Sequence, residues 1–349
     1  MNKKVATLLK MIALALGLLA IGVIIYKKIG DSKNKVFTLY DFAMGTSVSL
    51  TLYGVDDEDP VGKDIIARIN TLSNELISWR ESTSQLYRLN NSYEPGIEYN
   101  ISPELNEVIA MSYKICEDSK GALDITIRPL LNLWNIENAT VDTFSIPDFM
   151  SICEMLPEIG YENVSLTDNG VTIGKEGVIL DLGATGKGYA LDVIRDEFLQ
   201  DKVSGAVVTI GGSVLVYGCK NDGNPWNIGV RNPFGDDGDM MGYLKFEGDV
   251  NVCISTSGDY EKYIEFDGVR FHHIFDRETG YPAQSGLKSV TVVCENGLVS
   301  DGLSTACFVL GYDNSLELLK KYNAEAVFIT GGGEVIVTDG LKDNFSEAE

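Results

Sequence analysis

The sequence predicts an α+β protein: one large domain with antiparallel or mixed sheets and flanking helices, preceded by one N-terminal membrane helix. Three observations support this fold class. The 349 residues are 44% hydrophobic and 23% charged, which is typical of a globular protein. Strand-like and helix-like patterns follow one another irregularly, without the regular βαβα order of a doubly wound fold. One uncharged apolar run stands alone at the N-terminus, between two groups of lysines.

The N-terminal run, Met11 to Tyr26, has the pattern of an export signal or a membrane anchor. Its sixteen residues fall short of the roughly 20 that span a bilayer, but neighbouring leucines and snorkelling lysines can extend it. No small-x-small cleavage site precedes Lys27 and Lys28. We therefore predict an uncleaved signal anchor over residues 1–28, with a cleaved signal peptide as the alternative. Lysines flank both sides, so their distribution does not by itself decide the orientation.

A short polar linker over residues 29–36 follows, and the folded domain is expected over residues 37–349. Residues 36–53 alternate apolar and polar side chains, as a pair of strands would. Residues 64–77 and 103–116 repeat apolar side chains at helical spacing, and Ser102 is the predicted N-cap of the second helix. Short apolar runs and further helical patterns predict the later elements. These are a strand over 177–180, a helix over 181–199, two strands over 206–216, a strand over 288–294, a helix over 300–310 and a closing hairpin over 324–337.

The chain is strongly acidic, with 51 acidic against 28 basic residues. The first 35 residues hold seven lysines and one aspartate, so the remainder is more acidic than the whole. Such a surface repels phosphate backbones, which argues against nucleic acid as a partner. Any anionic ligand will need a cation or backbone amides. The two histidines, His272 and His273, are adjacent, so a three-histidine zinc site cannot form.

A glycine-rich turn lies in Asp181-Leu-Gly-Ala-Thr-Gly-Lys-Gly-Tyr-Ala190, between a predicted strand and a predicted helix. Such a turn offers free amides to a phosphate, and Lys187 adds a positive charge. The spacing matches neither a Walker A loop nor GxGxxG. The segment is therefore either a ligand-binding turn or a tight packing turn between strand and helix.

Two further segments carry polar groups. Asp301 and Thr305 are four residues apart on one face of a predicted helix, and together they can face one hard cation. Mg²⁺ is favoured because only oxygen ligands are offered, whereas helix capping by Ser300 or Asp301 is the alternative. In the segment 271–280 a histidine precedes an aspartate by three or four residues, which is as typical of a core histidine as of a catalytic one.

The ordered set of segments is more specific than any one of them. In chain order they are Met44-Gly45-Thr46; the serine-rich segment from Ser78 to Asn90; Gly121-Ala-Leu-Asp-Ile-Thr126 with Pro129-Leu130 and Trp134; the turn at 181–190; Gly211-Gly212; Thr256-Ser257-Gly258-Asp259-Tyr260; the His-Ile-x-Asp-x-x-Thr-Gly segment at 273–280; and Asp301 with Thr305. This set resembles the ApbE family, the FAD:protein FMN transferases, from about Phe37 to Val337.

The resemblance implies an ApbE-like domain, related to the T-fold, and a role for each matching residue. FAD would be held by Met44, Trp79, Ala122, Leu123, Asp124, Asp181, Lys187 and Phe275. Mg²⁺ would be bound by the carbonyl of Ala184, the carboxylate of Asp301 and the hydroxyl of Thr305. His273 matches the histidine proposed as the base. Because side chains alternate along a strand, Phe275 is expected on the same side as His273, and His272 on the other.

Three positions depart from the family pattern. Trp79 replaces a tyrosine, Arg277 replaces the usual proline, and Gly302 stands where alanine is common. Trp79 should stack as well as a tyrosine, and Arg277 leaves the spacing from histidine to aspartate intact. None of the three is expected to remove a needed functional group.

The resemblance implies Mg²⁺-dependent transfer of FMN from FAD to a Thr or Ser hydroxyl of an acceptor protein, with release of AMP. The acceptor in this covalent flavinylation would be a separate protein, either a subunit of a membrane redox complex or an extracytosolic flavoprotein. We expect a cell-membrane location with a single N-terminal anchor and an extracytoplasmic catalytic domain. The alternatives are a Mg²⁺-dependent FAD pyrophosphatase that yields FMN and AMP, and a non-catalytic surface FAD-binding protein. The presence of His273 argues against a pure binder, which needs no base.

Overall fold

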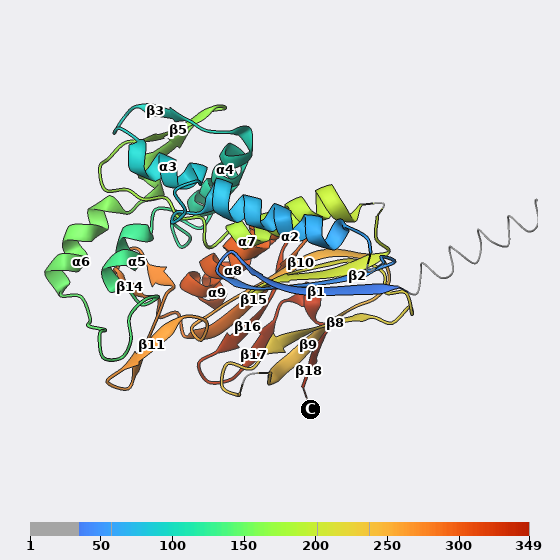
Figure 1. The fold of residues 1–349 in the computed structure, drawn as a ribbon. Coiled ribbons are helices and arrows are strands. Elements are labelled where there is room, and N and C mark those ends of the chain that lie inside the picture. The colour runs from blue at the N-terminus through green and yellow to red at the C-terminus, as the bar shows by residue number, and fades with distance from the viewer. Residues whose placement is uncertain (1–34, 57, 201, 237, 349) are drawn as a thin grey trace, which may run out of the picture.

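The computed structural model describes residues 35–348 except 57, 201 and 237 (Figure 1). The predicted anchor over 1–28 and most of the predicted linker over 29–36 lie outside the described residues. Within the described part, no helix is both long and apolar enough to cross a membrane. Membrane attachment therefore stays a prediction from the sequence.

An antiparallel sheet of eight strands forms the centre of the described chain, in the order β1-β2-β6-β7-β10-β15-β16-β17. These strands are β1 (Val36–Ala43), β2 (Thr46–Tyr53), β6 (Gly205–Ile210), β7 (Ser213–Gly218), β10 (Val250–Gly258), β15 (Leu287–Cys294), β16 (Glu325–Thr330) and β17 (Val335–Val337). The strand pairs predicted over 36–53 and 206–216 and the closing hairpin are confirmed. Met44 and Gly45 turn β1 into β2 with positive φ at both residues, as a tight hairpin turn requires.

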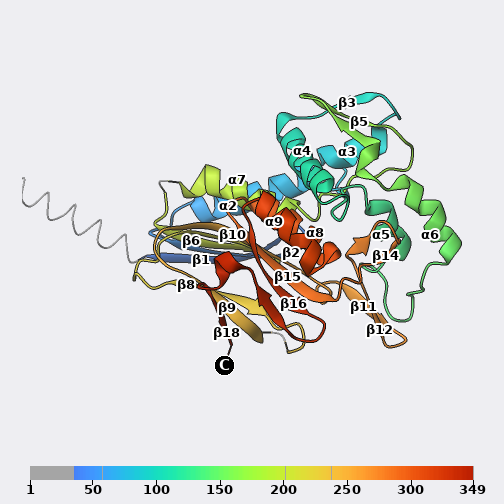
Figure 2. The same ribbon diagram turned by 180° about the vertical axis from the view of Figure 1, so that it is seen from behind.

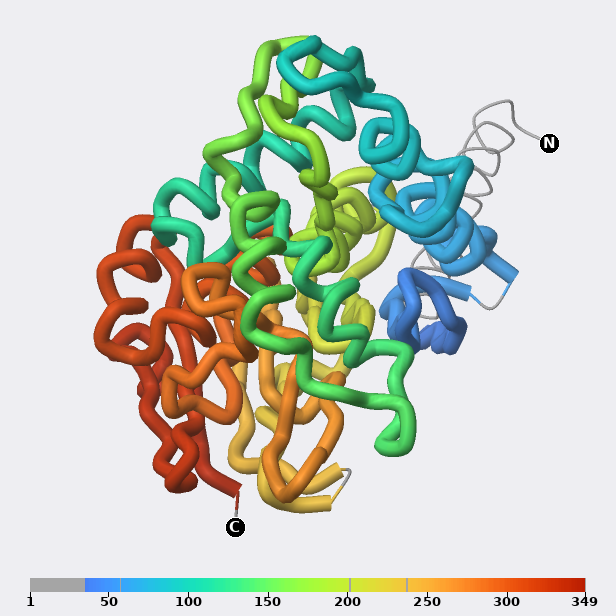
Figure 3. Tube along the Cα trace, turned by 90° about the vertical axis from the view of Figure 1, so that its left-hand side faces the viewer, coloured from blue at the N-terminus to red at the C-terminus, as the bar shows by residue number. Residues whose placement is uncertain are grey.

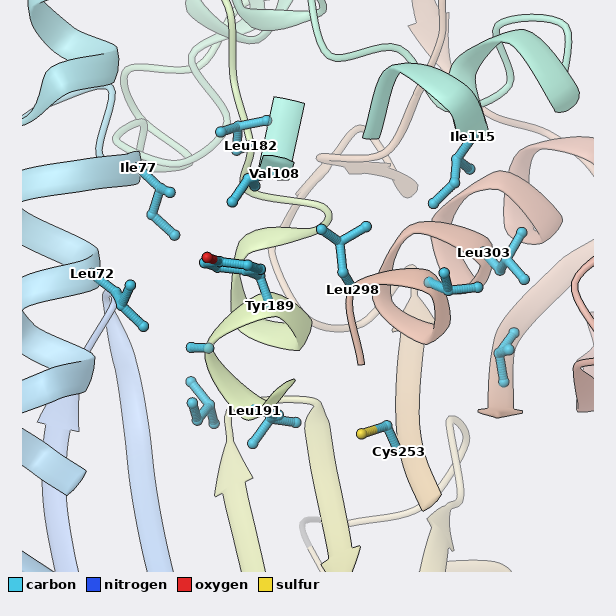
Figure 4. Close-up of a cluster of buried hydrophobic side chains, with 14 of the residues drawn as sticks. Leu72, Ile77, Val108, Ile115, Leu182, Tyr189, Leu191, Cys253, Leu298 and Leu303 are labelled. Atoms are coloured by element: carbon cyan, nitrogen blue, oxygen red, sulfur yellow. The ribbon is translucent and has the colours of Figure 1, made fainter. Parts of the chain in front are cut away.

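Helices cover one face of this sheet, as Figures 1 and 2 show. They are α2 (Val61–Thr71), which continues as the π-helical η1 (Leu72–Ile77), α7 (Gly186–Ile194), which continues as the π-helical η4 (Arg195–Leu199), α8 (Gly297–Leu310) and α9 (Tyr312–Lys321). Their inner side chains form the main core, in which Leu72, Tyr189 and Leu298 are buried (Figure 4). Full burial of each such leucine stabilises the fold by about 1.5–3 kcal/mol.

A smaller sheet, β18-β9-β8, covers part of the opposite face. Its strands are β8 (Trp226–Arg231), β9 (Met240–Phe246) and β18 (Phe345–Glu347). The short 3₁₀ helix η5 (Asp339–Leu341) precedes β18 in the chain. Trp226 and Leu244 pack there against Val216 and Ile254 of the large sheet. The large sheet is thus buried on both faces near β7 and β10.

A second lobe lies beside the helix layer (Figure 1). It contains α3 (Gln85–Ser92), β3 (Glu98–Asn100), α4 (Pro103–Asp118), α5 (Arg128–Trp134), α6 (Phe149–Met155), η2 (Leu156–Glu158), η3 (Tyr161–Asn163), β4 (Val164–Leu166), β5 (Gly170–Ile173), β11 (Tyr263–Phe266), β12 (Val269–His272), β13 (Phe275–Asp276) and β14 (Tyr281–Pro282). Trp134, Phe144 and Phe275 form a separate small core in this lobe. The predicted N-cap is confirmed, because the Ser102 hydroxyl accepts a hydrogen bond from the amide of Leu105.

The strand predicted over 177–180 is wrong. This segment makes only an isolated parallel bridge between Ile127 and Ile179. Its short apolar run reflects the burial of Val178 and Leu180 in a loop. The side-chain amide of Asn90 bonds both the N–H and the C=O of Leu180, at 2.9 Å each, and so replaces a neighbouring strand.

Two predicted helices begin at other residues than expected. The helix predicted over 181–199 begins at Gly186, because residues 181–185 form the glycine-rich loop. The helix predicted over 300–310 begins at Gly297, and Asn296 caps it by accepting from the amide of Val299. Capping by Ser300 or Asp301 is therefore wrong, which leaves the carboxylate of Asp301 free to serve another purpose.

Candidate active site

A pocket of about 600 Å³ lies where the second lobe meets the helix layer and the turns of the large sheet. Two hairpin turns of the sheet reach it, at Met44-Gly45 and at Gly211-Gly212. All twelve residues singled out in the sequence line this pocket: Met44, Trp79, Ala122, Leu123, Asp124, Asp181, Ala184, Lys187, His273, Phe275, Asp301 and Thr305. Segments more than 250 residues apart in the chain thus meet at one site.

Asp301 lies at the floor of the pocket, on α8, and is 4% exposed. Its Oδ2 accepts a hydrogen bond from the amide of Gly188 at 3.0 Å. Its Oδ1 accepts from the Ser213 hydroxyl at 3.0 Å, and the Lys187 ammonium lies 3.4 Å away. These donors hold the carboxylate in one orientation with a compensating positive charge beside it.

The other proposed metal ligands lie in the same pocket. Thr305 follows Asp301 by one helical turn, and its hydroxyl is 3.1 Å from that of Ser257 at the end of β10. Ala184 lies in the loop that precedes α7. This donor set contains only oxygen atoms and one carboxylate, which fits Mg²⁺, an ion that usually keeps several waters or substrate phosphate oxygens as ligands. Within the described residues no group of three or more His, Cys, Asp and Glu side chains is placed to hold a metal ion.

Two glycines allow the backbones of α7 and α8 to touch. A Cβ atom at Gly188 would lie 1.9 Å from the carbonyl oxygen of Gly297, and a Cβ at Gly297 would lie 2.3 Å from that of Gly188. Asp192 ties the same helices together, because its carboxylate accepts from the amides of Gly297 and Leu298 at 2.7 and 2.9 Å. Burial raises the pKa of Asp192, although these amides and Arg195 favour its charged form. The close contact places Asp301 directly against the first turn of α7.

His273 presents one ring nitrogen to the pocket. Its Nδ1 lies 3.2 Å from the carbonyl oxygen of Lys262. A carbonyl can only accept, so Nδ1 carries the proton and Nε2 keeps a free lone pair. Burial lowers the pKa of His273 to about 4, and the nearby charge of Lys262 adds to this effect. At neutral pH the ring is therefore uncharged and can accept a proton at Nε2.

His272, the last residue of β12, faces away from the pocket as predicted, although His273 follows in a bend and not in a strand. Its Nδ1 accepts from the amide of Ile274 at 3.3 Å, and its Nε2 donates to the carbonyl of Ala283 at 3.1 Å. Burial lowers its pKa as well. Both nitrogens are used within the protein, and the ring packs edge-on against Phe308. His272 is therefore a satisfied core histidine, which leaves His273 as the candidate base.

A wall of aromatic and charged side chains faces the metal ligands. The guanidinium of Arg128 lies 3.9 Å from the ring centre of Trp79, and that of Arg80 lies 4.4 Å from it. Arg128 is buried and also donates to the carboxylate of Asp181 at 3.1 Å. The other oxygen of Asp181 accepts from the amide of Gly183 at 2.7 Å, which closes the glycine-rich loop. The sequence did not predict these two arginine contacts with Trp79, which stays half-buried and lines the pocket.

Glu137 forms ion pairs with the three cationic side chains of this wall. Lys262 donates to it at 2.9 Å, Arg80 forms a second ion pair, and Arg128 lies 3.6 Å away. Burial opposes ionisation, but the three cations outweigh it and hold the pKa of Glu137 below its usual range. This part of the lining therefore holds three cations close to the carboxylates of Glu137 and Asp181, with which they pair.

The carboxylate of Asp124 accepts hydrogen bonds from other groups of the protein. Its Oδ1 accepts from the amide and the hydroxyl of Thr126 at 2.8 and 2.6 Å. Its Oδ2 accepts from the amide of Tyr161 at 3.0 Å and from Arg277 at 2.8 Å. Four donors saturate the carboxylate, so it orders the 121–128 loop and has no free lone pair for a ligand. Arg277, at a position where the family usually has proline, also binds Glu162 and so fastens this loop.

Sequence reasoning missed several residues of the site. Arg128, Glu137, Lys262, Ser213 and Asp192 carry no local motif, and each gains its place only by a contact across the fold. The one signal in the sequence was an arginine directly before Pro129, because a charged side chain inside a largely apolar motif segment needs a partner.

A buried carboxylate beside a lysine, a neutral histidine and two arginines is typical of an enzyme that acts on phosphate esters or anhydrides. The family model of the ApbE family matches residues 44–328, and the chain belongs to this family. The FAD:protein FMN transferase of Klebsiella pneumoniae is 30% identical over 318 residues, which cover 90% of this chain and 96% of that relative.

Solved structures agree with this assignment. The ApbE protein of Thermotoga maritima has a TM-score of 0.78 and 32% identity, over 90% of this chain and 100% of that one. The flavin transferase ApbE of Vibrio cholerae has a TM-score of 0.78 and 25% identity, over 89% of this chain and 99% of that one. The predicted α+β class with a single large domain is thereby confirmed.

Proposed function

We propose that the protein transfers FMN from FAD to a Thr or Ser hydroxyl of an acceptor protein and releases AMP. The observation that carries this proposal is one pocket that unites Asp301, Lys187 and a neutral His273, in a chain whose relatives are named FAD:protein FMN transferase. FAD is the substrate, and the product is a covalently flavinylated protein.

FAD needs a pocket that accepts a planar flavin and a charged pyrophosphate. Apolar and aromatic surface comes from Met44, Trp79, Ala122, Leu123 and Phe275. The pyrophosphate would lie toward Lys187 and the first amides of α7, where the helix dipole favours negative charge. Asp124 and Asp181 act through the loops that they order.

Mg²⁺ would be held by Asp301, Thr305 and the carbonyl of Ala184. When bound, the ion neutralises charge on the pyrophosphate and on the departing AMP. Asp301 is the only charged ligand of the three. Ser213 and the amide of Gly188 orient its carboxylate by hydrogen bonds to both oxygens.

His273 would take the proton of the acceptor hydroxyl at Nε2. The hydroxyl oxygen then forms a bond to the phosphorus on the riboflavin side, and the bond between the two phosphates breaks. The electron pair of that bond leaves with AMP, whose charge Lys187 helps to stabilise. The Lys262 carbonyl keeps the other ring nitrogen protonated and stabilises the imidazolium that forms.

The test is mass spectrometry of a candidate acceptor domain after incubation with the protein, FAD and Mg²⁺. We expect an added FMN on a Thr or Ser side chain and one equivalent of AMP. FMN and AMP in solution, with the acceptor unlabelled, would indicate a pyrophosphatase instead.

We further propose that residues 1–28 anchor the protein in the cell membrane, that residues 29–36 form a linker, and that the catalytic domain over 37–349 is extracytoplasmic. The uncharged run from Met11 to Tyr26 supports this proposal. A chain truncated to begin at Lys33 should stay soluble without detergent and still bind FAD. A requirement for detergent in that truncated chain would contradict it.

A further inference from the structure

β1 is an outer strand of the large sheet, and among the described residues it pairs only with β2. Figure 3 shows this strand pair, in dark blue, at the outer margin of the molecule. Natural proteins usually protect such an edge with lysines, prolines, bulges or a covering element. β1 spans eight residues in unbroken register with β2 and contains one charged side chain, Asp41.

The register identifies which backbone groups are free. The carbonyl of Lys35 accepts from the amide of Gly54, so odd-numbered residues of β1 direct their backbone groups toward β2. The even-numbered residues 36, 38, 40 and 42 direct theirs to the open edge. Among the residues that the structure describes, only the amide of Phe42 has a partner there, the adjacent carboxylate of Asp41 at 2.7 Å.

The same even-numbered residues carry exposed side chains. Val36, Thr38, Tyr40 and Phe42 are all exposed, with Tyr40 at 77% and Phe42 at 68%. The odd-numbered Phe37 and Leu39 instead pack against the core. β1 therefore offers free hydrogen-bonding groups and an uncharged, partly aromatic row of side chains along a single line.

This line ends at the active site. Phe42 belongs to the row and also lines the pocket, and the turn at Met44 and Gly45 follows it directly. A Thr or Ser side chain is short, so the backbone of any acceptor must come to the rim of the pocket before its hydroxyl can reach His273. A strand added to β1 would be guided to that rim.

We propose that the acceptor protein docks through an extended segment that pairs with the free edge of β1 and delivers its Thr or Ser into the pocket beside Phe42. Such strand addition takes affinity from main-chain hydrogen bonds and specificity from alternate side chains. The uncharged row and the acidic remainder of the chain select a segment of small, β-branched and apolar residues without acidic side chains. This inference rests on the proposed function, since it names where the partner in that reaction binds.

The test compares edge variants of the full-length protein. The probe is membranes of the host lacking this protein, supplied with FAD and Mg²⁺, and the readout is covalent flavin on host proteins as a function of membrane concentration. Thr38→Pro removes one outward amide and leaves the ladder to β2 intact, whereas Thr38→Val keeps that amide and serves as the matched control. Tyr40→Lys places a charge in the row, and Phe149→Ser removes a comparably exposed aromatic on α6.

We expect Thr38→Pro and Tyr40→Lys each to raise the apparent KM for membranes about tenfold or more, with FAD affinity within about twofold of the wild type. Thr38→Val and Phe149→Ser should behave as the wild type. If Thr38→Pro does not fold, Tyr40→Lys decides. Unchanged labelling by the folded edge variants overturns the proposal.

Two other occupants of the edge give distinct results. If the edge variants change the sedimentation of the protein from dimer to monomer, a second copy occupies β1 and the proposal is wrong. If their defect vanishes with detergent-solubilised acceptors, β1 contacts lipid and the proposal is wrong as well. If the wild-type protein hydrolyses FAD but labels no host protein, the proposed function itself fails. This result comes from the wild-type reaction alone and does not depend on the edge variants.

Discussion

The two walls of the pocket are held in place by different means. Asp301 stands on α8, whose backbone touches α7 at Gly188 and Gly297. The opposite wall consists of long side chains, with Arg128 and Lys262 converging on Glu137 from separate segments. Packed backbone holds the first wall, and ion pairs hold the second.

The difference indicates how each wall serves the reaction. Helices in backbone contact cannot shift without breaking the core, so the carboxylate of Asp301 stays fixed while charge develops. A wall of arginine and lysine side chains can adjust its rotamers and suits the binding of a large, flexible substrate. We therefore expect changes at the first wall to reduce turnover and changes at the second to weaken FAD binding.

The largest effect is expected from Asp301→Ala. The other proposed metal ligands are neutral and cannot replace its charge, so Mg²⁺-dependent transfer should fall by about 10³-fold or more. Transfer rates measured across a Mg²⁺ titration check this, with Ser213→Ala as a control that loses one hydrogen bond to Asp301 and keeps the charge. Undiminished Mg²⁺-dependent activity in Asp301→Ala would falsify the metal assignment.

His273→Ala should reduce transfer by about 10²–10⁴-fold, the usual contribution of a positioned base, and leave FAD affinity within a few-fold. His272→Ala is the matched control, because its ring is buried and fully hydrogen-bonded away from the pocket. Its effect should be mild on transfer and visible mainly as lower thermal stability. An inactive His272→Ala enzyme with active His273→Ala would reverse the assignment of the base.

Arg128→Lys tests the second wall. Lysine keeps the charge but loses the planar contact with Trp79 and the fork that joins Asp181 to Glu137, so the KM for FAD should rise about tenfold with kcat within a few-fold. Arg80→Lys, at a more exposed position on the same ring, should change KM less. A loss confined to kcat would show that this wall also acts on the reacting atoms.

The smallest effect is expected from pH. The pKa of His273 is lowered to about 4, so its protonated, inactive form accumulates only as the pH falls toward that value. Between pH 6 and 8 the dependence of kcat/KM on this group should be less than about twofold. A half-maximal rate near the ordinary histidine pKa of about 6.5 would mean that the ring is solvated in the working enzyme.

Much of the fold and most of the site could be predicted from sequence, for identifiable reasons. Residues 36–53 alternate because one face of each strand is buried, and a period of two is local information. His272 and His273 do have different surroundings, as the alternation predicted, although β12 ends at His272 and His273 lies in a bend. The short apolar run at 177–180 gave a wrong strand, because a buried loop whose backbone is bonded by Asn90 has the same apolar pattern as a strand.

By itself the sequence determined the helices and strands with clear periodicity, because these depend on neighbours a few positions away. It also determined the order of the motifs, and the resemblance of that order to a family implied the twelve candidate residues. Only the tertiary structure decided what those residues do for one another. It placed Arg277 where its guanidinium donates a hydrogen bond to the carboxylate of Asp124, and it placed Arg128 against Trp79. It also brought the backbones of α7 and α8 into contact. Hydrogen bonds and ion pairs act over a few ångströms in space, and no pattern along the chain specifies which distant segments come that close.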